Sequence, residues 1–361
     1  MHHKQIEEKY NTMKYRASWM PTVAGAFASI TKTASYHYSR LKVAPLAGVY
    51  IAYIAINSSA QAALTFSAGY SSALFFTHSN SDTINSYDWG SDSNLYYATA
   101  AEDFTSGGVY RNDGNSSTTI RAASADYAGA SVVAINSSVY FNDGNYPSSK
   151  IYRYNIDDST TTSTVATNYL LSKSGNSLVT TGSADFSTTQ ISYYAGGVLS
   201  GYLDIGAVAG GSGPCAFDAE GNMFYAPGYN DSSIYRWSTI EVAAALLGGS
   251  SSQLDAAGHQ WIDYSGSFAG AGASSLLIDA NGNVLVTLTD FVNPSALVKF
   301  DASGNGNYET VLTSTDRLGE LRMHEGALLI SDANRIITII PEPSTILVTL
   351  SGLLLLIRRK R

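Results

Sequence analysis

Residues 279–301 read DANGNVLVTLTDFVNPSALVKFD, and this stretch contains the pattern that predicts the fold. The polar segment Asp279–Asn283 favours a tight turn, because Asp bonds the turn backbone and Gly tolerates a positive φ. A run of strand-forming residues begins at Val284, and a second run surrounds Leu297 after a break at Asn293-Pro294. The stretch therefore predicts a turn followed by two antiparallel strands.

The same arrangement recurs along the chain. Its first strand is anchored by one apolar residue and its second strand by another, 8 to 13 residues later. The copies recur every 39 to 65 residues, which leaves room for two more strands in each unit. Four-stranded units at this period are typical of a β-propeller. The anchor pairs are Leu74/Ile84, Val139/Ile151, Leu178/Ile191, Met223/Ile234, Val284/Leu297 and Leu328/Ile336.

We therefore expect an all-β chain whose body is a propeller of six four-stranded blades. The 65-residue gap after Leu74 leaves a seventh blade open, because Asn94–Ala98 and Gly108–Asn112 also read as strands. We expect the strand near Leu64–Ala68 to complete the last blade, so that the two ends of the body pair. A β-sandwich or a β-helix is the alternative fold. One segment, Thr239–Leu247, reads as a helix.

Three turns precede the strands: Asp218-Ala-Glu-Gly-Asn, Asp279-Ala-Asn-Gly-Asn and Lys173-Ser-Gly-Asn. Asp-x-x-Gly-Asn before an apolar strand resembles the NHL-type and SMP-30/gluconolactonase-like propellers. For the lactonase-like members, the resemblance implies a divalent metal in the central channel, held by Glu, Asn and Asp. The Asp that would precede the turn is replaced by Cys215. A divalent-metal-dependent lactonase-like hydrolase is therefore only the alternative function, and we predict no cofactor and no catalytic residues.

The first 62 residues read as a leader. Arg40 and Lys42 precede the thirteen-residue apolar run Ala44–Ile56, and Ala60-Gln-Ala62 is a small-x-small site with cleavage expected before Ala63. These are the three parts of a secretory signal peptide. Residues 1–40 are a long polar lead, which indicates either a misplaced start with initiation at Leu41 or an extended leader. We therefore assign 1–40 to that lead, 41–62 to the signal peptide and 63–340 to the propeller.

The C-terminal residues 341–361 also have three parts. Pro341-Glu342-Pro343 precedes the apolar run Thr345–Ile357, and the chain ends with four cations, Arg358, Arg359, Lys360 and Arg361. A thirteen-residue helix spans about 20 Å, which is short of a bilayer core of about 30 Å, so it reaches across only with its flanks. The cations favour the cytoplasmic side. We expect a single hydrophobic helix here that pauses in the inner membrane.

This order of motifs resembles the PEP-CTERM sorting signal of Gram-negative bacteria. The resemblance implies export through the Sec translocon, cleavage by signal peptidase, and recognition by an exosortase that cuts near Pro-Glu-Pro. It further implies that the body reaches the cell surface or an extracellular matrix that contains exopolysaccharide. A plain C-terminal membrane anchor is the alternative.

The charge distribution argues against nucleic-acid binding. Between residues 63 and 340, ten Lys/Arg stand against twenty-six Asp/Glu, a net charge near −16. Such a body repels phosphates. The chain has one cysteine, so no intrachain disulfide forms, and Cys215 reads as a small buried residue.

Other candidate sites have simpler explanations. Asp279, Asn281 and Asn283 begin like a calcium loop, but Gly stands fourth and not sixth, so a hairpin turn is favoured. Asp113 and Asp143 lie in Asn-Asp-Gly-Asn stretches that favour surface turns, with Ca²⁺ as the unsupported alternative. His78, His259 and His324 are widely spaced and read as surface or channel residues.

Aromatic residues recur in the second strand of several copies. Period-two spacing places Tyr152 and Tyr154 on one face, and Tyr235 and Trp237 likewise. Packing between blades is one explanation of these aromatic residues. Stacking against a bound carbohydrate is the more specific hypothesis. The sequence thus predicts a non-catalytic, exported propeller that binds polysaccharide or protein.

Overall fold

The computed structural model describes residues 63–342, except 102–105, 125–130, 144–148, 167, 184–186, 230, 249–252 and 290–293. The predicted leader, signal peptide, apolar C-terminal run and basic tail lie outside the described residues. Within the part that is described, no helix has the length and apolar character needed to span a membrane. The account below concerns the unit that begins at Ala62.

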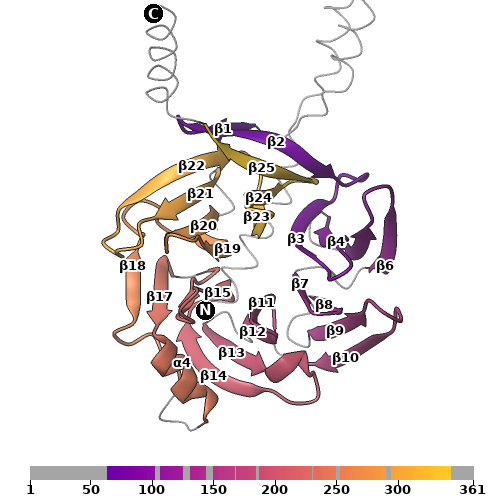
Figure 1. Ribbon diagram of the computed structural model, residues 1–361. Coiled ribbons are helices and arrows are strands. Elements are labelled where there is room, and N and C mark those ends of the chain that lie inside the picture. Colours follow the sequence, from indigo (N-terminus) through magenta and orange to yellow (C-terminus); the bar gives the residue numbers. More distant parts are fainter. Residues whose placement is uncertain are drawn as a thin grey trace, which may run out of the picture. The chain divides into compact units, whose positions relative to one another are not determined.

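Six antiparallel sheets form a ring (Figure 1). Blade 1 has β3 (Thr83–Trp89), β4 (Leu95–Ala100), β5 (Gly107–Asn112) and β6 (Ser117–Ser124). Blade 2 has β7 (Val132–Ile135), β8 (Ser138–Asn142), β9 (Lys150–Asn155) and β10 (Thr161–Val165). Blade 3 has β11 (Leu170–Ser174), β12 (Ser177–Ser183), β13 (Thr188–Tyr194) and β14 (Leu203–Ala209).

The second half continues the pattern. Blade 4 has β15 (Cys215–Phe217), β16 (Met223–Tyr225), β17 (Ser233–Trp237) and β18 (Gln260–Asp263). Blade 5 has β19 (Gly272–Ile278), β20 (Val284–Thr289), β21 (Ser295–Phe300), β22 (Tyr308–Ser314) and, as a fifth strand, β1 (Leu64–Phe66). Blade 6 has β23 (Leu318–His324), β24 (Ala327–Asp332), β25 (Arg335–Pro341) and β2 (Tyr70–Thr77). The all-β, six-bladed propeller is confirmed.

The first predicted pair of strand anchors is wrong. Leu74 lies in β2 and Ile84 in β3, which belong to different blades. Asn94–Ala98 and Gly108–Asn112 lie in the middle strands of blade 1, β4 and β5, so they do not form a seventh blade. The long gap arose because the first pair of anchors spans a junction between blades.

The ring closes through the N-terminal strands, but not as predicted. The strand at Leu64–Phe66 pairs with β22 of blade 5, with Leu64 opposite Ser314. It is β2 that completes blade 6, where Tyr70 lies opposite Pro341. Gly69, at φ +91°, lies between the two strands, where a residue with a Cβ would be strained. The chain thus bends from one blade to the next before it enters the ring.

The turns that identified the repeats are structural. The Asp279 carboxylate accepts from the backbone N–H of Asn281 and Asn283 at 2.8 and 2.9 Å. Asp218 accepts from Glu220 and Asn222 in the same way. The hairpin interpretation of both turns is therefore confirmed, and the predicted helix is present as α4 (Thr239–Leu246).

Apolar side chains pack between neighbouring blades. One cluster joins Phe224 and Ile234 of blade 4 to Leu276 and Val286 of blade 5. Another joins Ile84 and Tyr97 of blade 1 to Ile336 of blade 6. A middle strand such as β20 is covered on both faces, so it reads as a nearly continuous apolar run. The apolar core is therefore distributed around the ring, between neighbouring blades. The innermost strands surround the axis of the ring.

Candidate functional site in the central channel

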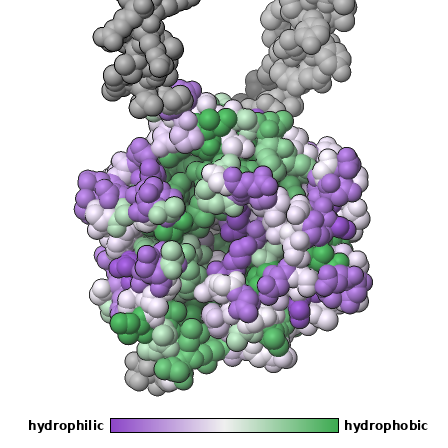
Figure 2. Space-filling view, in the orientation of Figure 1, coloured by the Kyte–Doolittle hydropathy of each residue, from purple (hydrophilic) through white to green (hydrophobic). Residues whose placement is uncertain are grey.

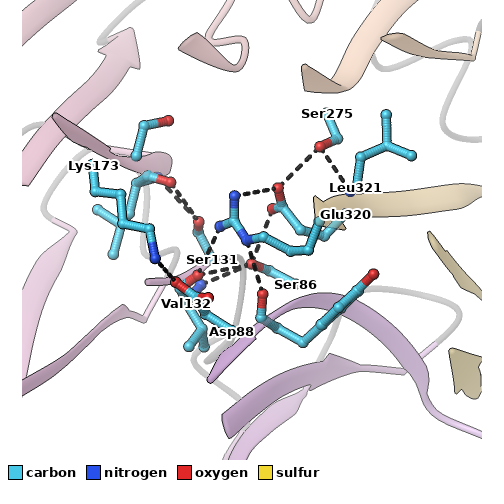
Figure 3. Close-up of polar contacts among 12 residues, drawn as sticks. Ser86, Asp88, Ser131, Val132, Lys173, Ser275, Glu320 and Leu321 are labelled. Carbon is cyan, nitrogen blue, oxygen red and sulfur yellow. Dashed lines mark hydrogen bonds and ion pairs between the residues drawn. The ribbon is translucent and has the colours of Figure 1, made fainter. Parts of the chain in front are cut away.

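Charged side chains converge from the innermost strands of three blades. Asp88 comes from β3, Lys173 from β11, and Glu320 and Arg322 from β23 (Figure 3). We call these four residues the axial cluster. Figure 2 shows hydrophilic residues around the middle of the face seen in Figure 1. A propeller brings the innermost strands together at its axis, so residues far apart in sequence meet there.

Asp88 is the most connected member of the axial cluster. Its Oδ2 accepts from Lys173 Nζ at 2.8 Å and from the backbone N–H of Ala134, in blade 2, at 2.9 Å. Only 7% of its side chain is exposed, against 42% for Lys173. Burial would raise the pKa of Asp88, but Arg322 and Lys173 together hold this pKa below its usual value. Asp88 is therefore an ionised carboxylate that joins three blades.

Glu320 and Arg322 form a second buried ion pair in the axial cluster. Glu320 Oε1 lies 3.2 Å from Arg322 Nη1 and accepts from Ser275 Oγ at 2.9 Å. Ser86 Oγ donates to Glu320 Oε2 at 3.1 Å. Burial raises the pKa of Glu320, although Arg322 opposes the shift. Arg322 also donates to the Tyr87 carbonyl from Nε at 3.1 Å. The two residues thus connect blade 6 to blades 1 and 5.

Serine hydroxyls join the innermost strands at three junctions. Ser86 Oγ accepts from the Val132 N–H at 3.0 Å, Ser131 Oγ from Leu171 at 3.0 Å, and Ser275 Oγ from Leu321 at 2.9 Å. In each case a serine on one innermost strand bonds the backbone of the next. These bonds satisfy strand edges that have no ladder partner at the channel. The polar channel wall is therefore part of the framework.

The axial cluster does not fit a divalent metal. Each of its carboxylates is already paired with a cation, and Lys173 and Arg322 would repel a second cation at the same place. Ca²⁺ needs six to eight oxygen ligands, including uncommitted carboxylates. Among the residues that the structure describes, no group of three or more His, Cys, Asp or Glu lies close enough to share a metal ion.

The four aromatic candidates are packed inside the molecule. Trp237 is fully buried, and Tyr154 and Tyr235 are 9% and 8% exposed. Tyr152 is half-buried, stacks on Phe141 at 5.2 Å and lies under the Arg121 guanidinium at 4.4 Å. The structure corrects the stacking hypothesis for these rings, because packing between strands covers the faces that a sugar would need.

Cys215 lies at the start of β15 and is buried. Burial raises the pKa of its thiol to about 12. A thiol of this kind is protonated at neutral pH and is a poor nucleophile. The prediction of a small buried residue is confirmed.

The histidines and turn aspartates also stay apart. The prediction for His78 is wrong: it is buried, and its Nδ1 lies 3.0 Å from the Tyr97 hydroxyl. His259 pairs with Glu241 at 2.9 Å, and His324 stacks on Trp89 at 3.7 Å. Asp113 is an exposed turn residue as predicted, but Asp143 is buried and accepts from the Lys150 N–H at 2.8 Å.

The sequence offered one signal for the axial cluster that went unused. Asp88 and Arg322 each stand between two large apolar residues, in YDW and LRM. A charged residue inside a buried strand is uncommon unless it is paired. Its partners were not readable, because Asp88, Lys173 and Arg322 lie in three different blades.

Comparison with known proteins supports the fold. No protein-family model matches the chain, and no curated protein matches it. Among solved structures, the Trichoderma reesei protein of Carbohydrate-Active Enzymes Family AA12, in an iodide structure, is 14% identical with a TM-score of 0.53. The match covers 78% of this chain and 98% of that one.

Two further matches are more distant. The PQQ-bound aldose sugar dehydrogenase of Streptomyces coelicolor is 12% identical, with a TM-score of 0.46, and the match covers 76% of this chain and 99% of that one. YCF48 of Cyanidioschyzon merolae is 10% identical, with a TM-score of 0.44 and coverages of 76% and 99%. At these identities the likeness concerns the fold alone, and the fold is the propeller implied by the NHL/SMP-30-like turns.

Proposed function

We propose that this chain is an exported, non-catalytic propeller that binds polysaccharide at the cell surface or in the extracellular matrix. One observation carries the non-catalytic part. The charges at the axis, where lactonase-like propellers would hold their metal, are paired with one another and bond the blades together. Side chains engaged in this way are not available to bind a metal or to transfer protons. Among the described residues of the axial cluster, no carboxylate is left unpaired for the metal that the lactonase-like alternative would need.

The ends of the body support the export part. Ala63, the predicted first residue after signal cleavage, already bonds blade 5, since its N–H donates to Thr315 Oγ1 at 3.1 Å. The last strand ends at Pro341, the first residue of Pro-Glu-Pro. Cleavage before Ala63 and near Pro-Glu-Pro would therefore leave every blade intact. Processing by signal peptidase and an exosortase in a Gram-negative cell, with passage of 345–357 through the inner membrane, is part of this proposal.

Terminal peptide mapping by mass spectrometry tests the export proposal on native protein from its own cells. We expect a mature chain that starts at Ala63 and ends near Pro341–Pro343. We expect to recover this mature chain from the cell surface or from the culture medium. A mature chain that keeps Thr345–Arg361 would contradict the sorting-signal proposal and indicate a standing membrane anchor.

Affinity gel electrophoresis tests the binding proposal. We expect the purified full chain to migrate more slowly through gels that contain a soluble polysaccharide than through plain gels. Bovine serum albumin, run in parallel, controls for viscosity. Equal relative mobility in gels with polygalacturonate, dextran and xylan would contradict polysaccharide binding, and a protein partner would then be the remaining form of the proposal.

A further inference from the structure

A groove lies at the outer rim, where blade 1 faces blade 2. It has a volume of about 340 Å³, which falls within the range of small-ligand sites. Strands β5 and β6 supply one side, and the β9–β10 hairpin supplies the other. We call it the rim groove; it is lined by Arg111, Thr118, Thr119, Ile120, Tyr154, Ser159 and Thr161.

The rim groove combines hydroxyl groups with a small apolar floor. Thr118, Thr119, Ser159 and Thr161 are exposed, so their hydroxyls are open to solvent. Ile120 is half-buried and supplies the apolar floor, whereas the Tyr154 ring is 9% exposed and packed near Tyr96 at 6.2 Å, so its faces are not open to a sugar. A sugar ring has hydroxyls at its edge and C–H groups on its faces, so it matches a site with hydroxyls around an apolar floor.

Arg111 adds a positioned cation. Its Nη2 lies 2.9 Å from Asp92 Oδ2, and 38% of its side chain is exposed. Asp92 also accepts from Asn94 Nδ2 at 2.7 Å and from the Tyr96 hydroxyl at 3.0 Å, so it is itself held in place. A guanidinium has five N–H donors, and this contact uses one end of it. Its Nε is buried, so the N–H groups at the outer end of the guanidinium, on Nη1 and Nη2, are the donors that can meet a carboxylate.

Ser159 borders the rim groove. It occupies the β9–β10 turn at φ +59°, a conformation that favours glycine. Its Oγ accepts from the Tyr154 hydroxyl at 3.0 Å, at the wall of the rim groove. The acid next to it, Asp158, is turned into its own loop, where its Oδ1 accepts from the Thr160 N–H at 2.9 Å.

We propose that the rim groove binds an acidic saccharide, with Arg111 holding a uronate carboxylate and the Thr and Ser hydroxyls bonding the sugar hydroxyls. This inference rests on the proposed function and names its site and ligand class. The body as a whole is acidic. Binding of an anionic polymer therefore depends on a local cation, which makes Arg111 the residue to test.

The test is isothermal titration of the full chain with galacturonate oligosaccharides. Their methyl-esterified forms and dextran oligosaccharides serve as probes without the carboxylate. We expect wild-type protein to bind the free acid alone, and Arg111→Gln to weaken binding by about 10- to 100-fold, as loss of a charge-assisted bond does. Arg236→Gln removes an exposed cation from blade 4 and should leave the affinity unchanged.

Ser159→Gly separates binding from folding. Glycine suits the positive φ, so we expect the Tm to stay within a few degrees of wild type while binding weakens about threefold or more. If wild type binds galacturonate but Arg111→Gln matches Arg236→Gln, the rim groove is overturned and the proposed function stands. If wild type binds the ester or dextran equally well, the acidic ligand class is overturned. If it binds no saccharide, the rim groove and the polysaccharide-binding part of the proposed function both fall.

Discussion

Replacing Arg322 with methionine lowers the free energy of unfolding by about 3–5 kcal/mol, the usual result of removing one partner from a buried ion pair. Methionine replaces the apolar stem of Arg322 but leaves Glu320 without its cation at 3.2 Å. It also removes an attraction that holds the pKa of Asp88 down. Urea unfolding followed by tryptophan fluorescence measures the loss.

The pH dependence of the variant distinguishes lost charge pairing from lost packing. Burial already raises the pKa of Glu320 in the folded protein, and removing Arg322 takes away the main opposing influence. A carboxyl with a raised folded pKa binds its proton more readily in the folded state, so stability increases as pH falls. We therefore expect the destabilisation to shrink between pH 7 and pH 5. A loss that is constant over this range would contradict the electrostatic explanation.

Exposed pairs provide the matched controls. Lys299 pairs with Glu309 at 3.2 Å on the surface, where both side chains are partly solvated. Lys299→Met should cost no more than about 1 kcal/mol, because water screens such pairs. Lys173→Met should fall between the two variants, since Lys173 is 42% exposed but its partner Asp88 is buried. Equal losses in all three variants would contradict the assignment of the axial cluster as the structural centre.

Removing β2 should destabilise the folded protein at least as much as replacing Arg322 does. Without Tyr70–Thr77, seven residue pairs with β25 are lost, and β25 becomes an open edge. Phe76 also leaves the cluster that it shares with Ile84, Tyr97 and Ile336. We expect a body that begins at residue 80 to lose its cooperative thermal transition, because domains are stable by only about 5–15 kcal/mol. Differential scanning calorimetry and limited proteolysis measure this.

A body that begins at residue 69 is the control. It lacks β1, which adds a short fifth strand to blade 5, but it keeps β2. Only three residue pairs with β22 are lost. We expect a cooperative transition at a modestly lower temperature. If both truncations behaved alike, closure of blade 6 by β2 would not be what holds the ring together.

The repeats in the sequence were sufficient to predict the propeller architecture. Turns such as Asp279–Asn283 act locally, since the Asp carboxylate bonds N–H groups two and four residues away. The following strands are covered on both faces, so their apolar runs are visible without knowledge of their neighbours. This is why blades 2 to 6 were found and why blade 1, with YDW in β3 and Gly-Gly in β5, was misread.

The sequence alone determined an all-β propeller and most of its turns, because these depend on neighbours within about a dozen residues; the targeting signals at its two ends stay predictions. Only the tertiary structure decided which N-terminal strand closes the ring, how the axial cluster is paired, and that Thr119 and Thr161 line the same rim groove. Those relations join residues that are brought together by the curvature of the ring. No local pattern encodes that curvature, because it results from the packing of all six blades at once.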